Sequence, residues 1–256
     1  MTPMVSVVIP FYNMQEFIAQ TIDWVLESTY PTMEIILIDD GSTDGSGAIA
    51  SRYAERFDHI TFLKQQNQGV SVARNHGISH ARGNYILPVD GDDRLCSGFI
   101  EEAVRVLETR PEVKVVTSEG EFFGGRTGPR KLPNFDINLL ARKNIMHVSA
   151  LYRKSDWAAA GGYCPEMKGR EDWDFWISML KDGGEVVKLP IVGYKYRIRP
   201  NSKRIRTRKL KRQINDLLNA RHREFFKRAL GGPLRINRSW SKPYNRVLSF
   251  FGLLKS

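Results

Sequence analysis

Short apolar runs alternate with helical patterns through the first half of the chain. The runs are rich in β-branched residues and five or six residues long, which is typical of strands buried on both faces. Between them, apolar residues recur every three or four positions, which is typical of amphipathic helices. The runs predict strands over residues 4–9, 33–38, 59–63, 84–89 and 113–117, and the helical patterns cover Phe17–Leu26, Ile49–Phe57, Val70–His80 and Phe99–Leu107. Strands separated regularly by helices predict a parallel, doubly wound α/β sheet.

The pattern becomes looser beyond Glu119. Residues 124–133 are rich in Gly, Pro and Arg, which predicts a mobile loop. No internal repeat is evident, and no apolar stretch reaches the ~18 residues that a membrane-spanning helix needs. The first residues lead directly into a strand without the basic region of a signal peptide, and Cys96 and Cys164 have no metal-ligand spacing. These features indicate a globular protein of a reducing cytoplasm.

The charge of the chain is unevenly distributed. The net charge is +11, but residues 203–256 contain 16 Lys or Arg residues against the acids Asp216 and Glu224, a net charge of +14. Residues 1–202 therefore carry −3. We expect a mildly acidic globular domain over residues 1–202 and a basic extension over residues 203–256, with different roles.

Polar clusters follow three of the predicted strands. The cluster "PFYN" (10–13) follows the first strand, "DDGSTD" (39–44) the second and "DGDD" (90–93) the fourth. Ligands of open α/β sheets bind outside the carboxyl ends of the strands, so all three clusters can converge on one ligand. Ordinary turn chemistry explains any one cluster, but it does not explain why the acids recur at the same edge.

The cluster that follows the fourth strand places Asp90 and Asp92 on either side of Gly91. Carboxylates this close repel each other unless a cation neutralises them, and hard oxygen ligands suit Mg²⁺ or Mn²⁺. Such a cation keeps coordination positions open for substrate phosphates. The sequence therefore predicts a metal and phosphate site here, with a solvated turn as the alternative.

Several motifs together point to a known family. The segments "VSVVIPFYN", "ILIDDGSTD", "NQGVSVARNHGI", "YILPVDGDD" and "GGYCPEMKGREDWDFWISML", in this order, resemble the nucleotide-sugar glycosyltransferases of family 2. The resemblance covers roughly the first four-fifths of the chain and weakens after "YKYRIRPNS" (194–202). It implies the GT-A fold, a Rossmann-like, mostly parallel sheet flanked by helices. It also implies an inverting transfer from a nucleoside-diphosphate sugar, with UDP as the commonest donor nucleotide.

The resemblance also implies a donor site. Pro10, Tyr12 and Asp40 would hold the base and ribose, and Gly69 and Arg74 would line the site beside Asn67 and Gln68. Asp90 would contact the ribose or the metal, and Asp92 would bind the Mn²⁺ or Mg²⁺ that bridges the diphosphate. Asp93 is a third member of the cluster that could instead cap the next helix. The implied donor-binding set is Pro10, Tyr12, Asn13, Glu16, Asp40, Gly69, Arg74, Asp90 and Gly91.

The acceptor hydroxyl needs a base, because displacement at the anomeric carbon releases its proton. The resemblance assigns this role to Asp172, with Glu171 beside the acceptor or positioning Asp172. Apolar residues at helical spacing follow this pair, from Trp173 to Leu180. The alternative is that both acids only favour the start of a helix through its dipole.

The chain departs from the family pattern near residue 199. Related sequences often have a metal-binding His there, whereas this chain has Arg199. Arg cannot bind a cation but can pair with a diphosphate, so Arg197, Arg199 and Lys203 are candidate diphosphate contacts. His147 is left out of the catalytic set, because a lone His is more often a packed or surface residue.

The basic extension has an apolar stripe near helical spacing from Leu210 to Leu230 and ends in "VLSFFGLL" (247–254). A basic, amphipathic and aromatic segment suits an anionic membrane surface, where it would bring the enzyme to a lipid-linked acceptor. The alternative is that the stripe packs on the catalytic domain. The extension has no recognisable nucleic-acid motif, so no nucleic-acid partner is expected.

The sequence thus predicts a metal-dependent glycosyltransferase, peripheral on the inner face of the cytoplasmic membrane, that adds sugar to a glycan or lipid-linked acceptor in cell-surface polysaccharide assembly. A nucleotidyltransferase would also use paired acids and a metal, but it is expected to carry a Gly-rich basic loop after the first strand, and "IPFYNMQEF" is not one. A non-catalytic membrane-associated scaffold on the same fold is a second alternative.

Overall fold

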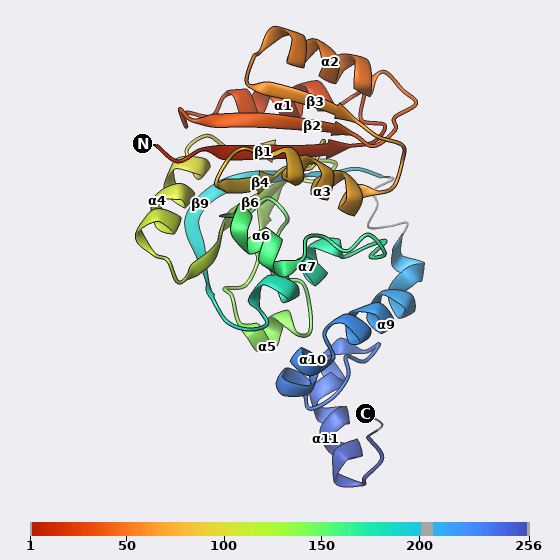
Figure 1. Cartoon of the computed structure of the whole chain (residues 1–256). Helices are drawn as coiled ribbons and strands as arrows, with labels where there is room; N and C mark the ends of the chain where they lie inside the picture. The colour runs from red at the N-terminus through yellow and green to blue at the C-terminus, as the bar shows by residue number, and fades with distance from the viewer. Residues whose placement is uncertain (1, 201–206, 255–256) are drawn as a thin grey trace.

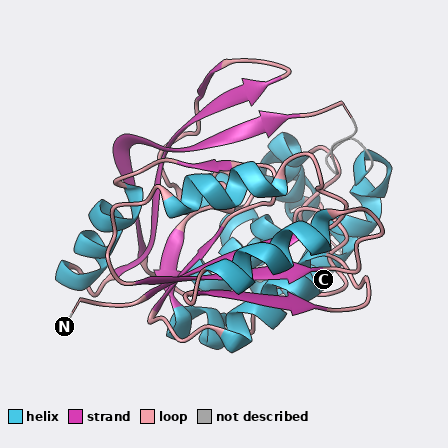
Figure 2. Cartoon of the chain, turned by 90° about the horizontal axis from the view of Figure 1, so that it is seen from above, coloured by secondary structure: helices cyan, strands magenta, loops and turns pink. Residues whose placement is uncertain are grey.

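The computed structural model describes residues 2–200 and 207–254. The predicted α/β architecture is confirmed: four parallel strands pair in the order β3-β2-β1-β4. They are β1 (Val5–Phe11), β2 (Met33–Asp39), β3 (Ile60–Lys64) and β4 (Tyr85–Pro88). The helices that connect them are α1 (Ile18–Leu26), α2 (Ser46–Arg56) and α3 (Val70–His80), each close to its predicted range. Figure 1 shows α2 above β3 and α1 behind β2 and β3, and Figure 2 shows helices layered over the sheet.

The rest of the sheet is mixed. Strand β8 (Leu151–Arg153) pairs antiparallel with both β4 and β6 (Val113–Gly124), so the fifth predicted strand does not lie next to the fourth. Strand β9 (Glu185–Ile198) runs parallel to β6, and β5 (Arg94–Leu95) pairs with β9. The helices of this half are α4 (Phe99–Thr109), α5 (Ile137–Leu140), α6 (Lys154–Ala160) and α7 (Glu171–Leu180).

The loop expected over residues 124–133 is partly wrong. Strand β7 (Gly128–Arg130) lies inside it and pairs antiparallel with Gly120–Phe122 of β6. A strand of three residues rich in Gly and Pro has no apolar period of its own. Strand β7 exists because its backbone pairs with β6, and such pairing cannot be predicted from the composition of the segment.

Alternate residues of the central strands face two hydrophobic clusters, because successive side chains of a strand point to opposite faces. Val5, Val7 and Ile9 of β1 pack in the cluster that contains residues of α1, α2 and α4. Val8 of the same strand packs in the cluster that contains residues of α3 and α7. Both faces of the sheet are therefore covered, as the continuous apolar runs predicted.

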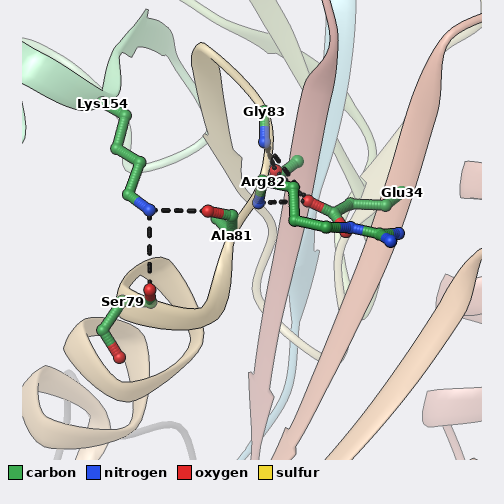
Figure 3. Close-up of polar contacts among 7 residues, drawn as sticks. Glu34, Ser79, Ala81, Arg82, Gly83 and Lys154 are labelled. Atoms are coloured by element: carbon green, nitrogen blue, oxygen red, sulfur yellow. Dashed lines mark hydrogen bonds and ion pairs between the residues drawn. The ribbon is translucent and has the colours of Figure 1, made fainter.

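A buried carboxylate fixes the turn that leads into β4 (Figure 3). Glu34 Oε1 accepts hydrogen bonds from Ser6 Oγ and from the backbone N–H of Arg82, both at 2.6 Å. Lys154 Nζ donates to the carbonyl of Ala81 at 2.6 Å. Burial raises the pKa of Glu34, but these bonds and the Arg82 charge outweigh it, so the pKa lies below its ordinary value. The turn holds the start of β4, whose other end carries the Asp90 cluster.

The first part of the basic extension belongs to the core. It forms α9 (Lys211–Arg221) and α10 (Arg223–Leu230) after a short 3₁₀ turn, Thr207–Leu210. Its buried apolar residues lie in the same cluster as Trp173 and Trp176 of α7; they are Ile214, Leu218, Phe225, Phe226 and Leu230. This corrects the expectation that the whole segment 203–256 is a separate membrane-docking part: the stripe packs on the domain, which was the stated alternative.

The second part of the extension has a different environment. It contains a 3₁₀ turn, Arg238–Trp240, and α11 (Ser241–Phe250), which lies in Figure 1 at the end of the molecule far from β1–β3. Within residues 2–200 and 207–254, no helix has both the length and the apolar character needed to cross a bilayer.

Candidate active site

A cavity of about 340 Å³ lies beyond the carboxyl ends of β1, β2 and β4, where the polar clusters were expected to converge. This volume is within the range of small-molecule sites. The residues predicted from sequence that line it are Pro10, Tyr12, Asp40, Asn67, Gln68, Gly69, Arg74, Asp90, Gly91, Asp92, Glu171 and Arg199. The three clusters therefore do meet at one site, which turn chemistry alone would not require.

Asp40, at the end of β2, organises one wall of the cavity. Its Oδ1 accepts from the backbone N–H of Gln68 and its Oδ2 from that of Gly69, both at 2.9 Å. Gly69 has a φ of 94°, which favours glycine, and it begins α3 immediately after this loop. The buried carboxylate of Asp40 therefore holds the loop that forms the wall, in addition to lining the cavity itself.

Arg74 of α3 connects the two acidic motifs. Its Nη2 donates to Asp90 Oδ1 at 2.6 Å, and its Nη1 lies 3.6 Å from Glu171 Oε1. The guanidinium also lies over the ring of Tyr163, 5.3 Å from the centroid. Burial lowers the pKa of Arg74, but the charge of Asp90 and its neighbours raises it further, so the net shift is upward and the group stays charged. One buried cation therefore joins acids that are 81 positions apart in the chain, Asp90 and Glu171.

Asp92 faces a second cation. Its Oδ2 lies 2.6 Å from Arg199 Nε at the end of β9. Burial, followed by the charge of Asp90, raises the pKa of Asp92 to about 6, although Arg199 acts in the opposite direction. Only glycine fits without a steric clash at position 91, between the two acids, because a Cβ there would lie 2.9 Å from Phe11 Cβ. Asp90 and Asp92 together carry more negative charge than the single guanidinium of Arg199 can neutralise.

Arg197, one of the candidate diphosphate contacts, is not among the residues that line the cavity. Its backbone N–H donates to Asp93 Oδ1 at 2.9 Å, and its Nε donates to the carbonyl of Asp92 at 2.8 Å. Its guanidinium lies over the ring of Phe123. Arg197 and the buried Asp93 thus fix the Asp cluster to β9, and Asp93 caps no helix. Lys203 lies outside the described residues.

The predicted catalytic acids occupy different positions at the start of α7. Glu171 lines the cavity, whereas Asp172 is half-buried and does not. Asp172 Oδ2 accepts from Asn144 Nδ2 at 2.6 Å, and its Oδ1 accepts from the backbone N–H of Trp173 at 2.9 Å. Burial, followed by the charge of Glu171, raises the pKa of Asp172 to about 6. The geometry therefore presents Glu171 to the cavity and holds Asp172 behind the wall.

Two predicted donor residues are not brought into the cavity. Asn13 is exposed with a φ of 52°, and its Oδ1 accepts from the backbone N–H of Thr43 at 2.8 Å. Glu16 is exposed and absent from the lining. His147, left out of the catalytic set, is buried, bonded to Thr117 and stacked on Tyr194 with centroids 3.5 Å apart. The interpretation of His147 as a packed residue is confirmed.

Sequence reasoning missed part of the opposite wall. This wall includes Pro165, Met167 and Lys168 from the loop before α7, and Tyr196 from β9. Asn144, which holds Asp172, was missed as well. The loop residues lie within the segment that resembles the family, but a single Lys or Met in a loop has no spacing that marks it as functional. Tyr196 belongs to β9, a strand whose burial pattern does not alternate and which was not predicted from the sequence.

The donor set fits a divalent cation only in part. No group of three His, Cys, Asp or Glu side chains in residues 2–200 and 207–254 is arranged to hold a metal. Asp90 and Asp92 offer two carboxylates in a cavity lined by further polar groups. Mg²⁺ in such sites is often held by one or two carboxylates together with substrate phosphates and water, so two protein ligands are sufficient. The residues present therefore supply part of a cation's ligands, and a diphosphate and water would have to supply the rest.

Residues 6–164 match the profile described as Glycosyl transferase family 2. The chain belongs to this family. It is 34% identical over 221 residues to the uncharacterized glycosyltransferase EpsJ of Bacillus subtilis, a match covering 79% of the chain and 63% of EpsJ. It is 30% identical over 207 residues to the putative teichuronic acid biosynthesis glycosyltransferase TuaG of the same organism, covering 78% of the chain and 81% of TuaG.

Solved structures confirm the GT-A fold. The family 2 chain superimposes with a TM-score of 0.73 on Staphylococcus aureus TarS residues 1–349 in complex with UDP-GlcNAc, at 18% identity over 96% of this chain and 73% of that one. It superimposes with a TM-score of 0.71 on the mannosyltransferase PcManGT of Pyrobaculum calidifontis in complex with GDP-Man and Mn²⁺, at 20% identity over 100% and 77%. At these identities the likeness shows the fold alone.

Proposed function

We propose that this family 2 chain transfers a sugar from a nucleoside-diphosphate sugar to an acceptor hydroxyl, with inversion at the anomeric carbon. One observation carries the proposal: Asp90 and Asp92 at the end of β4 face a cavity that also contains Arg74, Arg199 and Glu171. Such a mixture of acids and bases can hold a cation and a diphosphate together. The carboxylates suit the cation, and guanidinium groups suit phosphate oxygens.

The donor nucleotide is assigned to the wall made by the ends of β1 and β2. Tyr12 is partly exposed, so its ring offers a stacking surface for a base, and Asp40 with Gly69 offers polar groups beside it. UDP is the first nucleotide to test, because it is the commonest in the family that the sequence resembles. The structural neighbours were solved with UDP-GlcNAc and with GDP-Man, which makes GDP the second.

Asp90 and Asp92 would hold the Mn²⁺ or Mg²⁺, which when bound neutralises charge on the leaving diphosphate. Arg199 is the protein's own cation at the same place and is assigned to a diphosphate oxygen once Asp92 has a metal to bind. Arg74 stays buried between Asp90 and Glu171 and holds the two acidic motifs at a fixed separation. In this scheme Arg74 positions the site, and Arg199 stabilises the leaving group.

We assign Asp172 as the general base that accepts the proton of the acceptor hydroxyl. A pKa of about 6 leaves this carboxylate ionised at neutral pH yet more basic than an exposed Asp, which suits a general base. Because Asp172 lies behind the wall, the acceptor must approach it past Glu171, or α7 must turn slightly when the acceptor binds. Glu171 is the alternative base, since it already lines the cavity.

The names of two relatives support a class of acceptor. Their names refer to teichuronic acid biosynthesis for TuaG and to minor teichoic acid biosynthesis for GgaB of Bacillus subtilis, which is 31% identical over 162 residues. These names support a growing cell-surface glycan or its lipid-linked precursor as the acceptor. The inner face of the cytoplasmic membrane is the proposed place of the reaction.

The test is a donor screen with purified chain. UDP-linked and GDP-linked sugars are incubated with and without Mn²⁺, and release of nucleoside diphosphate is followed together with the anomeric configuration of the product. Metal-dependent release from one donor and an inverted product support the proposal. Retained configuration would exclude single displacement. Release of pyrophosphate from a nucleoside triphosphate with a sugar phosphate would instead support the nucleotidyltransferase alternative.

A further inference from the structure

Helix α11 buries polar side chains and exposes apolar ones, the reverse of an ordinary amphipathic surface helix. Its buried side chains are polar: Ser241 and Asn245 are fully buried. Ser241 Oγ accepts from the backbone N–H of Arg235 at 2.9 Å, and Asn245 Nδ2 donates to the carbonyl of Pro233 at 2.9 Å. The face that α11 turns to the protein is therefore held by hydrogen bonds, in contrast to the apolar faces of α9 and α10.

The outward face of α11 is apolar and aromatic. Trp240, Tyr244, Val247 and Phe251 are exposed and spaced by four, three and four positions, which places them along one side of a helix. Phe250 and Phe251 are the extreme cases, with 84% and 66% of their surfaces exposed. Scattered exposed apolar residues are ordinary, but a continuous stripe of large ones marks a surface that binds something.

The segment that contains this stripe has no acidic residue after Glu224. From Phe225 to the last residue the sequence has seven Lys or Arg residues and no Asp or Glu. Lys242 and Arg246 are exposed and lie on the side of α11 between its buried polar face and Phe250. An apolar stripe with Trp and Tyr, flanked by bases, matches the chemistry of a helix lying in the interface of an anionic bilayer.

We propose that the outward face of α11, together with Phe250 and Phe251, docks this chain on an anionic lipid bilayer. The aromatic side chains enter the interfacial region, while Lys242 and Arg246 contact lipid phosphates. Helices α9 and α10 take no part, because their apolar residues are already buried against α7. The proposal does not depend on the transferase activity and stands if that assignment fails.

A second copy of the chain is a poorer occupant of the same face. A symmetric contact places the same patch on both subunits, so the exposed Lys242 and Arg246 of one copy would approach those of the other, and α11 has no acid to pair with them. An anionic leaflet removes this repulsion and adds attraction. Charge complementarity therefore selects the membrane.

The experiment is co-sedimentation of the full chain with vesicles of phosphatidylcholine, alone or mixed with phosphatidylglycerol. The native chain is expected to bind the mixed vesicles and to be released in part by salt, since charge attraction is screened while the apolar contact is not. Lys242→Glu with Arg246→Glu is expected to reduce partitioning by at least about tenfold. Phe250→Ser with Phe251→Ser is expected to reduce it by a similar factor and to remove the salt-resistant part.

Matched controls separate docking from general charge and hydrophobicity. Arg52→Glu with Lys131→Glu makes the same charge change at exposed sites away from α11, and Ile191→Ser removes an exposed apolar residue of β9. Both controls are expected to bind like the native chain. The proposal is overturned if the native chain ignores phosphatidylglycerol, or if the controls lose as much binding as the α11 variants. A dimer in solution that Phe250→Ser with Phe251→Ser abolishes, without vesicle binding by the native chain, would assign the face to a second copy and also overturn it.

Discussion

The two walls of the cavity differ in how they are built. The first comes from segments that directly follow β1, β2 and β4, and carries Tyr12, Asp40 and Asp90. The second comes from the loop before α7 and the end of β9, and carries Lys168, Glu171 and Arg199. Each wall is bonded to the other by an arginine: Arg74 reaches Glu171, and Arg199 reaches Asp92.

The difference shows which functions each wall can have. The first wall consists of short strand-end loops. Backbone N–H groups that donate to Asp40 fix one of them, so this wall suits the binding of the donor, which is the same in each reaction cycle. The second wall depends on a long loop and on a strand that pairs far from its sequence neighbours. We therefore expect changes in the first wall to affect donor binding. In the second wall, changes of the acids at the start of α7 should affect turnover, whereas Arg199, which faces Asp92, should act on the donor.

The largest expected effect tests the first wall. Asp92→Asn should reduce transfer by about 10³-fold or more, because it removes a carboxylate from the cation that stabilises the leaving diphosphate. Calorimetric titration should show weaker UDP binding in Mn²⁺ but unchanged binding in EDTA. Asp58→Asn is the control, since Asp58 is an exposed carboxylate away from the cavity. Full activity of Asp92→Asn, or of the native chain in EDTA, would remove the metal from the scheme.

The next effect tests the second wall. Asp172→Asn should lower kcat by about 10²-fold with donor affinity nearly unchanged, the usual scale for loss of a general base. In the native chain, kcat should be full well above pH 6 and fall as pH decreases through about 6, because protonation removes the base. Glu171→Gln should move this fall to lower pH, since the charge of Glu171 raises the pKa of Asp172. If Glu171→Gln loses turnover while Asp172→Asn keeps it, Glu171 is the base.

A third change tests whether the C-terminal helices support the second wall. His222 Nε2 and Arg221 Nε both lie 2.8 Å from Asp174 Oδ1, a fully buried carboxylate three residues after Glu171. His222→Asn should lower the free energy of unfolding by about 2 kcal/mol, because the buried charge loses a hydrogen bond. Denaturant unfolding measures this effect, with His80→Asn on the exposed end of α3 as the control. Equal stability of the two variants would show that α9 and α10 do not brace α7.

The smallest effect tests the ion pair that joins the walls at the metal site. Arg199→Lys keeps the charge but loses the planar donor group, so KM for the donor should rise about tenfold with kcat changed less. Steady-state kinetics at saturating acceptor measure this split, and Arg52→Lys is the matched control at an exposed site. A larger loss in kcat than in KM would assign Arg199 to the transition state alone.

The sequence by itself determined the first wall. Apolar runs five or six residues long define buried strands, and parallel strands bring their carboxyl ends to one edge, so the residues following them meet without further information. That is why the clusters containing Pro10, Tyr12, Asp40 and Asp90 were expected at one edge of the sheet, and these four residues do line the cavity. Arg74 and Gly69 were placed through the resemblance to family 2, and the lining of the cavity contains both.

Only the tertiary structure decided the second wall and the roles of the basic extension. The insertion of β8 between β4 and β6, the pairing of β9 with β6, and the inward turn of Glu171 rather than Asp172 depend on contacts between distant segments. The extension shows the same limit most clearly. Its basic and apolar residues follow one pattern from Leu210 to Phe251, yet α9 and α10 bury their apolar face and α11 exposes its own. The periodicity of a sequence shows that a helix has an apolar face. Whether another part of the protein covers that face depends on tertiary contacts, such as those of α9 and α10 with α7.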